Sequence, residues 1–111
     1  ESILEAGKRR LKEEMGIEVD LHQAGSFHYV AQLENNLIEN EFDHVLLGYY
    51  ENDKIPYNIE EVLSCRWITL SEIEQSYHEN PEYFTKWFFQ AYLIAKNALP
   101  ISLSRVNHVA K

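Results

Sequence analysis

The sequence predicts one layered domain of the α+β or α/β class. Its 111 residues are 45% hydrophobic, which is enough for a single core and too few for two. A helical period near the start, alternating apolar and polar residues in the middle and a second helical period near the end give the order helix, strands, helices. This order is typical of a sheet covered by helices.

The first element is predicted to be a helix over residues 2–15. Leu4, Leu11 and Met15 recur at the spacing of a core-facing side, with charged residues elsewhere. Gly16 follows in the position where glycine commonly ends a helix. The alternation in residues 17–21 then predicts a short strand.

The middle of the chain is predicted to form a hairpin. Residues 25–33 read as an aromatic-rich strand, and residues 34–36 (Glu-Asn-Asn) are typical of a turn. We therefore expect residues 37–50 to pair back on the preceding strand. A loop marked by Pro56 follows, and residues 64–69 predict another short strand.

Two helices are predicted next, followed by a tail. Ser71 with Glu74 three residues later matches a capping box, so we expect a short helix there. Asn80-Pro81 is expected to open the longest helix, which would run to about Leu99. Its apolar stripe would comprise Phe84, Trp87, Phe88, Ala91 and Ala95. Residues 100–111 show no clear period, so we place the domain at 1–99 and a C-terminal tail at 100–111.

Charge and composition restrict the partners. A net charge of −8 argues against nucleic acid or an anionic membrane, whereas an anionic small molecule would require a local metal or arginine. No apolar run approaches the ~20 residues that cross a bilayer. The single cysteine, Cys65, excludes an internal disulfide and fits a reducing cytosol, so we expect a cytoplasmic protein.

The first helix carries a candidate anion and metal site. Arg10 lies one turn before Glu14, so the two side chains share a face and can pair. A cation beside a carboxylate suits a complex of diphosphate and metal. Glu13 is about 100° away from Glu14 around the helix. A solvated charged helix is the alternative, and the helix alone favours it.

A second candidate site is the acidic row Glu39, Glu41 and Asp43. Residues two apart in a strand share a face, so the Cα atoms of Glu39 and Glu41 would lie ~7 Å apart, close enough to share one divalent ion. The other face, with Phe42, is mostly apolar. A solvent-exposed hairpin face explains the spacing equally well.

Taken together, these motifs resemble the type I isopentenyl-diphosphate isomerases of the Nudix superfamily. The first helix resembles a Nudix box, matched by Glu1, Arg9, Leu11, Glu13, Glu14, Gly16 and Ile17. Arg10 stands where a Nudix hydrolase carries glutamate. Further along the chain, the resemblance is carried by Phe27-His28-Tyr29, Glu39-x-Glu41-x-Asp43, Glu61-Val62, Trp67-Ile68 and Trp87. It extends from Glu1 to about Leu99.

The resemblance implies a Nudix-type α/β/α fold, incomplete at its N-terminus, with a mixed sheet flanked by the first and last helices. It implies interconversion of isopentenyl and dimethylallyl diphosphate by protonation and deprotonation. Glu41 and Tyr29 match catalytic residues, and Glu39 and Glu41 match metal ligands. Glu14 matches the ligand of a diphosphate-bound Mg²⁺. Arg10 and Trp87 match substrate-binding residues, with Trp87 facing the cationic transition state.

The resemblance also implies missing parts. A second divalent metal (Mg²⁺, Mn²⁺ or Zn²⁺) would need three histidines that this chain lacks, as it lacks the family's cysteine. Because the chain starts with Glu1 in a predicted helix, we expect it to be part of a longer protein, inactive alone and prone to self-association. Tyr29 and Trp87 could instead be packing residues. A Nudix hydrolase of a nucleotide-like diphosphate and a non-catalytic remnant stay open as alternatives.

Overall fold

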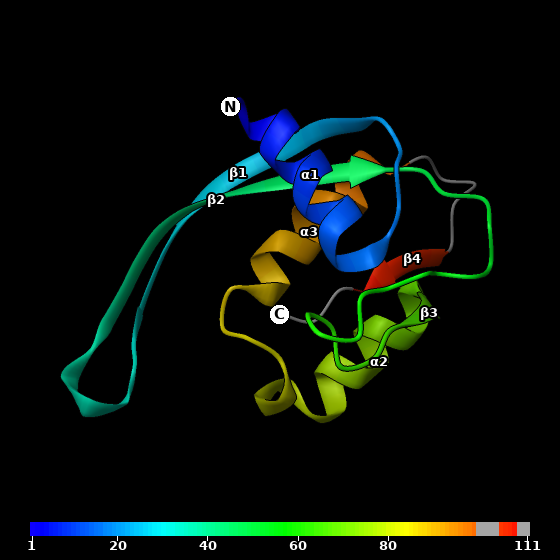
Figure 1. Cartoon of the computed structure of the whole chain (residues 1–111). Coiled ribbons are helices and arrows are strands. Elements are labelled where there is room, and N and C mark those ends of the chain that lie inside the picture. The colour runs from blue at the N-terminus through cyan, green and yellow to red at the C-terminus, as the bar shows by residue number, and fades with distance from the viewer. Residues whose placement is uncertain (100–104, 109–111) are drawn as a thin grey trace.

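The computed structural model describes residues 1–99 and 105–108, which form helices and antiparallel strands (Figure 1). In chain order the helices and strands are α1 (Ile3–Met15), β1 (Leu21–Gln32), β2 (Ile38–Gly48), β3 (Arg66–Thr69), α2 (Leu70–Glu79), α3 (Phe88–Ala98) and β4 (Arg105–His108). Short 3₁₀ turns lie at Glu34–Asn36 and Pro81–Tyr83. The prediction of a mixed helix and strand class is confirmed.

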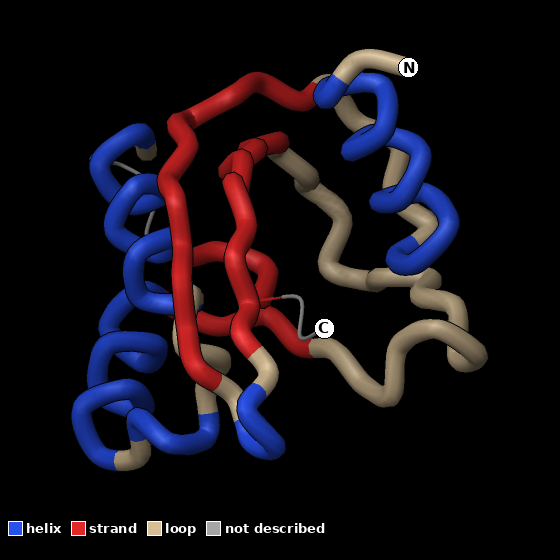
Figure 2. Tube along the Cα trace, turned by 90° about the vertical axis from the view of Figure 1, so that its left-hand side faces the viewer, coloured by secondary structure: helices blue, strands red, loops and turns tan. Residues whose placement is uncertain are grey.

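The β1–β2 hairpin lies between α1 and α3, so the predicted helix, sheet, helix layering is present (Figure 2). The packing is close on both sides. A Cβ added at Gly7 of α1 would overlap the side chain of Leu46 in β2, and one added at Gly25 of β1 would lie 2.8 Å from Ile94 of α3. Glycine therefore allows each helix to approach the hairpin closely.

The sheet differs from the prediction of one mixed sheet. Among the described residues the strands form two separate antiparallel pairs, β1 with β2 and β3 with β4. The β1–β2 pair is joined by a tight turn, whereas β3 finds its partner in β4, far along the chain. A mixed sheet would need a parallel neighbour, and no described strand provides one.

Strand β4 lies in the segment that was predicted to be an irregular tail. Arg105–His108 pair with Arg66–Thr69, so this part of the predicted tail has regular structure. Four residues are too few to show a period in the sequence. The rest of the predicted tail, residues 100–104 and 109–111, lies outside the described residues.

Helix α1 matches its prediction at both ends. The side chain of Ser2 accepts a hydrogen bond from the Glu5 N–H at 3.1 Å, and Gly16 ends the helix with φ +68°. Residues 17–20 do not form the predicted strand. Ile17 is buried in the core instead, and β1 begins only at Leu21. The alternation in this segment therefore reflects packing of a loop.

The hairpin turn follows the prediction. Asn35 and Asn36 both have left-handed backbones, with φ of 63° and 60°, a conformation that asparagine tolerates better than most residues. The register pairs Tyr29 with Glu41 and Ala31 with Glu39. An irregularity between Gln23 and Gly25 shifts the pairing by one residue on the β1 side.

The C-terminal helices begin at other residues than predicted. Thr69, not Ser71, caps α2, and it forms a capping box with Glu72. The predicted long helix from Pro81 is interrupted. A 3₁₀ turn ends at the extended residue Phe84, and α3 begins at Phe88. The longest helix of the described part is therefore α1, with 13 residues.

Two apolar clusters make up the described core. Met15, Ile17 and Val62 join the end of α1 to the loop after β2, and Ile68, Ile73 and Tyr92 join β3, α2 and α3. The described helices include none that is both long and apolar enough to cross a bilayer. The first cluster thus fixes the end of α1 against the loop between β2 and β3, and the second fixes β3 against α2 and α3.

Candidate functional site

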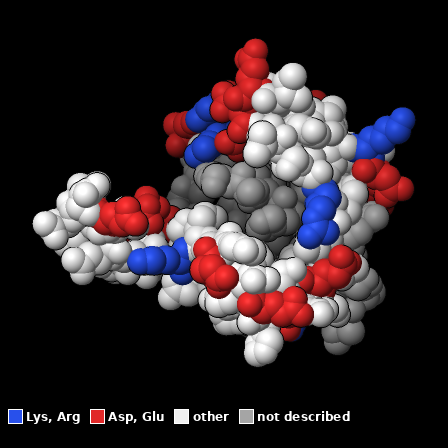
Figure 3. Space-filling view, turned by 90° about the horizontal axis from the view of Figure 1, so that it is seen from below, with Lys and Arg blue, Asp and Glu red and all other residues white. Residues whose placement is uncertain are grey.

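The acidic row lies on one face of β2, as its spacing predicts. Glu39, Glu41 and Asp43 share the face of the hairpin that carries the buried side chain of Tyr29. Phe42 lies on the opposite face, where it is exposed and contacts the ring of His44. Acidic side chains are visible on the hairpin where it projects from the body of the molecule (Figure 3).

Tyr29 connects β1 to this row. It lies directly across from Glu41 in the register, beside the carboxylate of Glu39. Burial raises the pKa of Tyr29, and its interaction with Glu39 and the negative charges of Glu39, Glu41 and Asp43 raise it further. At neutral pH the hydroxyl is therefore protonated and can donate to the acidic row.

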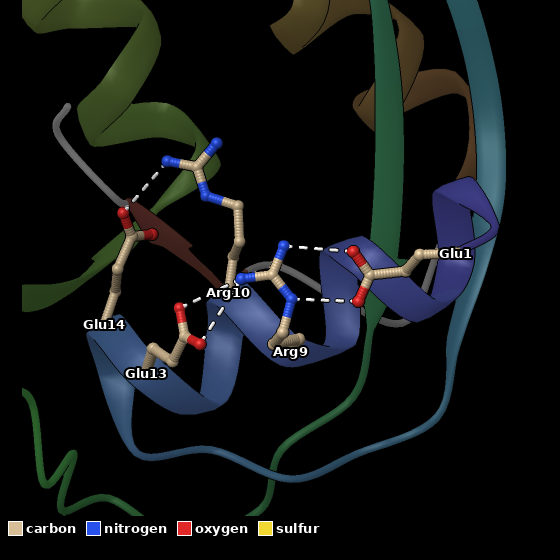
Figure 4. Close-up of polar contacts among 5 residues, drawn as sticks. All are labelled: Glu1, Arg9, Arg10, Glu13 and Glu14. Atoms are coloured by element: carbon tan, nitrogen blue, oxygen red, sulfur yellow. Dashed lines mark hydrogen bonds and ion pairs between the residues drawn. The ribbon is translucent and has the colours of Figure 1, made fainter.

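The pair on α1 also forms as predicted. Arg10 Nη2 lies 3.2 Å from Glu14 Oε1, and both side chains point to the same side of the helix (Figure 4). The Glu14 side chain is only 21% exposed, whereas that of Arg10 is 51% exposed. A carboxylate that is mostly buried, beside an exposed cation, can bind a ligand that carries both negative charge and metal.

A second group of ion pairs on the same helix is centred on Arg9. The guanidinium of Arg9 donates to both carboxylate oxygens of Glu1, at 2.9 and 3.1 Å, and to Glu13 at 3.3 Å (Figure 4). The hydrogen bonds to Glu1 and Glu13 raise the pKa of Arg9. Arg9 is therefore the partner of Glu13, and Arg10 is the partner of Glu14.

Trp87 lies just before α3, at the end of the hairpin that carries the acidic row. It is half-buried and not in the interior of the helix where the apolar stripe predicted it. The preceding residue, Lys86, donates to the carbonyl oxygen of Gln32 at 3.1 Å, while Ile94 packs near Gly25 at the other end of β1. Helix α3 therefore runs antiparallel to β1, and Trp87, next to Lys86, lies toward the Gln32 end of β1.

The oxygen ligands suit a hard divalent cation, but they form only part of a site. Among the side chains that the structure describes, no three from His, Cys, Asp or Glu are gathered as a metal site would require. Glu14 therefore does not join Glu39 and Glu41 around one ion. The row can supply two carboxylates to one metal and Glu14 a single carboxylate to another, with the remaining ligands coming from elsewhere.

His28 and His44 do not complete the row. They pair with Phe42 and Ser26 on the opposite face of the hairpin, as their alternation predicts. Sequence reasoning missed Lys86 and Asn58. Lys86 is a basic residue within an aromatic segment, which is a weak signal. The backbone N–H of Asn58 donates to the Glu14 carbonyl at 2.8 Å, a contact with no sequence signal.

The model of the NUDIX domain matches residues 1–88, which includes α1, the hairpin and the segment up to Trp87. The chain belongs to the Nudix family. Helix α1, which carries the Arg10–Glu14 pair and the contacts of Arg9, lies within the matched residues.

Several curated proteins named isopentenyl-diphosphate Delta-isomerase are similar to this Nudix chain. A Photobacterium profundum protein is 44% identical over 101 residues, covering 89% of this chain and 56% of the relative. A Serratia proteamaculans protein is 42% identical over 88 residues, 79% of this chain and 49% of the relative. A Burkholderia multivorans protein is 35% identical over 101 residues, 91% of this chain and 56% of the relative.

The chain spans about half the length of these relatives. No solved structure matches it. The similarity extends beyond the Nudix helix, because an alignment of 101 residues within a chain of 111 must also include the hairpin and the acidic row. The Photobacterium profundum relative is therefore similar to this chain in the hairpin that carries the acidic row as well.

Proposed function

We propose that this chain is part of an isopentenyl-diphosphate Delta-isomerase, an enzyme that interconverts isopentenyl and dimethylallyl diphosphate. The observation that carries the proposal is the placement of Tyr29 across from Glu41 and in contact with Glu39, in a chain whose relatives carry that name. A buried hydroxyl next to a row of carboxylates suits a reaction that moves protons on carbon.

In this proposal the reaction adds a proton to one alkene carbon and removes a proton from another, so the double bond moves and the atoms balance. Glu41 exchanges the proton with substrate, and Tyr29 relays or holds it, because its raised pKa keeps the hydroxyl protonated at neutral pH. A metal-bound carboxylate has a lowered pKa and is a poor acid by itself. Tyr29 would therefore supply the proton that Glu41 alone donates poorly.

Trp87 would stabilise the positive charge that develops on the substrate. Its position toward the Gln32 end of β1 suits an indole facing the reacting carbon atoms. A cation–π contact of this kind contributes ~2 kcal/mol or more when water is excluded. The proposal therefore gives the half-buried tryptophan a role besides packing.

Arg10 and Glu14 would bind the diphosphate end of the substrate. Arg10 would contact the phosphate oxygens, and Glu14 would be a ligand of a diphosphate-bound Mg²⁺. Glu39 and Glu41 would be ligands of a second divalent metal. The metals would neutralise the diphosphate and order the carboxylates, which is the chemistry that bound divalent ions supply.

We expect the 111-residue chain to show no isomerisation by itself, because its described residues gather no complete set of metal ligands. The test is a chimera that joins this chain to the part of the Photobacterium profundum relative that it does not match. Each protein is incubated with isopentenyl diphosphate, Mg²⁺ and Mn²⁺, and dimethylallyl diphosphate is measured, with the full-length relative as positive control.

The expected result is activity in the chimera, none in the chain alone and a large loss in the Glu41→Gln chimera. His44→Gln is the matched control, since His44 lies on the same strand but on the opposite face. A folded chimera that releases phosphate from a nucleotide diphosphate, and forms no dimethylallyl diphosphate, would reject the isomerase and favour a Nudix hydrolase. A chimera with neither activity would favour a non-catalytic domain.

A further inference from the structure

The loop between β2 and β3 is fastened to the rest of the molecule at several points. The indole Nε1 of Trp67 donates to the carbonyl oxygen of Asp53 at 2.8 Å, and the Tyr50 hydroxyl donates to that of Lys54 at 2.9 Å. Stacking of Tyr50 on Trp67 joins these two contacts. The first half of the loop is therefore held by Trp67 of β3 and by Tyr50, two residues past the end of β2.

The second half of the loop is held by the Nudix helix. The backbone N–H of Asn58 donates to the carbonyl oxygen of Glu14 at 2.8 Å. The last four carbonyl groups of a helix have no partner within the helix, so this bond satisfies one of them. Pro56 lies so close to Gly16 that a Cβ added at Gly16 would overlap the carbonyl oxygen of Pro56.

Asn58 also organises the turn that follows it. Its side-chain oxygen accepts from the Glu60 N–H at 3.0 Å, and its carbonyl oxygen accepts from the N–H groups of Glu61 and Val62 at 3.0 and 2.8 Å. This turn places Val62 in the core beside Met15, the residue after Glu14. Asn58 thus connects a rigid turn to the backbone of Glu14 itself.

We infer that Asn58 is a positioning residue for Glu14. By holding the Glu14 carbonyl and packing the adjacent turn on Met15, it fixes the last turn of α1, and with it the direction of the Glu14 carboxylate that pairs with Arg10. The inference rests on the proposed function in one respect, namely that Glu14 belongs to the diphosphate and metal site.

The position of a metal ligand matters because a shift of about 1 Å in a binding group can weaken a site substantially. Removing the Asn58 N–H leaves the Glu14 carbonyl without its partner and frees the end of the helix. The effect reaches the ligand only through Glu14. The structure therefore predicts that changes at Asn58 and Glu14 are coupled.

The test measures binding of inorganic diphosphate with Mg²⁺ by calorimetry, using the active chimera described above. Asn58→Pro removes the N–H that Glu14 accepts. Asn52→Pro is the matched control, because Asn52 forms the same kind of turn in the same loop, with its side chain accepting from the Lys54 N–H at 3.0 Å. Glu14→Gln and the Glu14→Gln, Asn58→Pro double variant complete a mutant cycle.

We expect Asn58→Pro to weaken binding about tenfold, Asn52→Pro to change it less than twofold, and the double variant to bind like Glu14→Gln alone. Thermal unfolding checks that each variant folds. Equal binding by Asn58→Pro and the unchanged protein would overturn the inference. So would an additive loss in the double variant, since that is the result of a general structural effect.

The inference and the proposed function fail in different ways. Diphosphate binding that responds to Asn58 and Glu14 as a coupled pair, in a protein without isomerase activity, would reject the function and keep the positioning role. Isomerase activity, combined with diphosphate binding that is unchanged by Asn58→Pro, would support the proposed function and reject the positioning role. If the chimera binds no diphosphate in the presence of Mg²⁺, Glu14 has no such ligand to be positioned for, and the inference is wrong.

Discussion

At the scale of single residues, the contact between α2 and α3 depends on a buried tyrosine. The Tyr92 hydroxyl donates to Glu74 Oε2 at 2.5 Å, and Lys96 Nζ lies 2.8 Å from the same oxygen. Burial raises the pKa of Tyr92, and the bond to Glu74 raises it further. The neutral hydroxyl is therefore the form that the fold requires.

We predict that Tyr92→Phe lowers the free energy of unfolding by about 1 kcal/mol, because it removes this bond and keeps the ring. Urea denaturation at pH 7 measures the loss. Tyr83→Phe is the control, since the Tyr83 side chain is 80% exposed and has little to lose. Equal stability of both variants would show that the short bond contributes nothing.

The same reasoning applies to Tyr29 in the candidate site. We predict that Tyr29→Phe lowers kcat of the active chimera by about 10²-fold or more, the usual size of a lost proton-transfer group. Because the hydroxyl must be protonated to relay the proton, the unchanged enzyme should lose activity at alkaline pH as Tyr29 ionises.

The measurement is a pH–rate profile of both proteins, in which the alkaline loss should be absent from Tyr29→Phe. Tyr49→Phe serves as control because Tyr49 lies beyond the end of β2 and is exposed. A kcat within threefold of the unchanged value would identify Tyr29 as a packing residue.

Some of these residue contacts could be predicted from the sequence and others could not. The Arg10–Glu14 pair follows from helix geometry, and the shared face of Glu39 and Glu41 follows from strand geometry, so both were predictable. The bond from Asn58 to Glu14 joins a loop to a distant helix. No local period encodes such a contact.

At the scale of elements, α2 shows how two equivalent patterns were resolved by the fold. Thr69 with Glu72 and Ser71 with Glu74 both have capping-box spacing. The structure uses the first, in which Thr69 Oγ1 accepts from the Glu72 N–H at 3.1 Å. Glu74 is occupied by Tyr92 and Lys96 of α3, so tertiary contacts decide the cap.

We predict that Thr69→Ala lowers the free energy of unfolding by about 1 kcal/mol, the usual cost of losing a cap, and that Thr69→Ser restores most of it. Ser71→Ala is the control and should have little effect. Thermal or urea unfolding distinguishes the two. A larger loss at Ser71 than at Thr69 would show that the cap lies where the sequence alone placed it.

The cap also predicts a pH dependence. The hydrogen bonds from Thr69 lower the pKa of Glu72 below its ordinary value of 4.5. A carboxyl group whose pKa is lowered by folding adds stability above its ordinary pKa and loses it as the pH falls through the lowered pKa. The difference between Thr69→Ala and the unchanged protein should therefore be full at pH 7 and shrink in acid.

The interrupted helix before α3 could not be predicted from its period. The helical spacing of the apolar residues does not show where the helix starts, because Pro81 and Phe88 are both compatible with it. These apolar residues are Phe84, Phe88 and Ala91. In the structure the ring of Phe84 packs against Tyr77 of α2 with centroids 5.5 Å apart, which holds Phe84 in an extended conformation. Aromatic packing thus overrides the helical pattern at this point.

At the scale of the whole molecule, the hairpin is the least protected element. It projects from the body (Figure 1). Three apolar side chains on the face opposite the acidic row are each more than half exposed, namely Val30, Ile38 and Phe42. Within the described residues, neither outer edge of the β1–β2 pair has a strand partner. Open edges and exposed apolar side chains favour association with other chains.

We predict that the 111-residue chain self-associates as its concentration rises, and that Ile38→Lys combined with Phe42→Lys reduces this association. Sedimentation velocity over a concentration series measures it. Ile59→Lys is the control, because Ile59 is 81% exposed in the loop after β2. A chain that stays monomeric at high concentration, or a control that acts as strongly as the hairpin variant, would contradict the prediction.

The contacts between Trp67 and the loop after β2 should be visible in tryptophan fluorescence. The chain contains two tryptophans, and Trp87→Phe would leave Trp67 as the sole strong fluorophore. Its indole N–H bonds to Asp53 and its ring stacks on Tyr50, so the emission of this variant depends on whether the loop is docked. Undocking would expose the indole to water and move its emission to longer wavelength, which makes the loop visible without any added label.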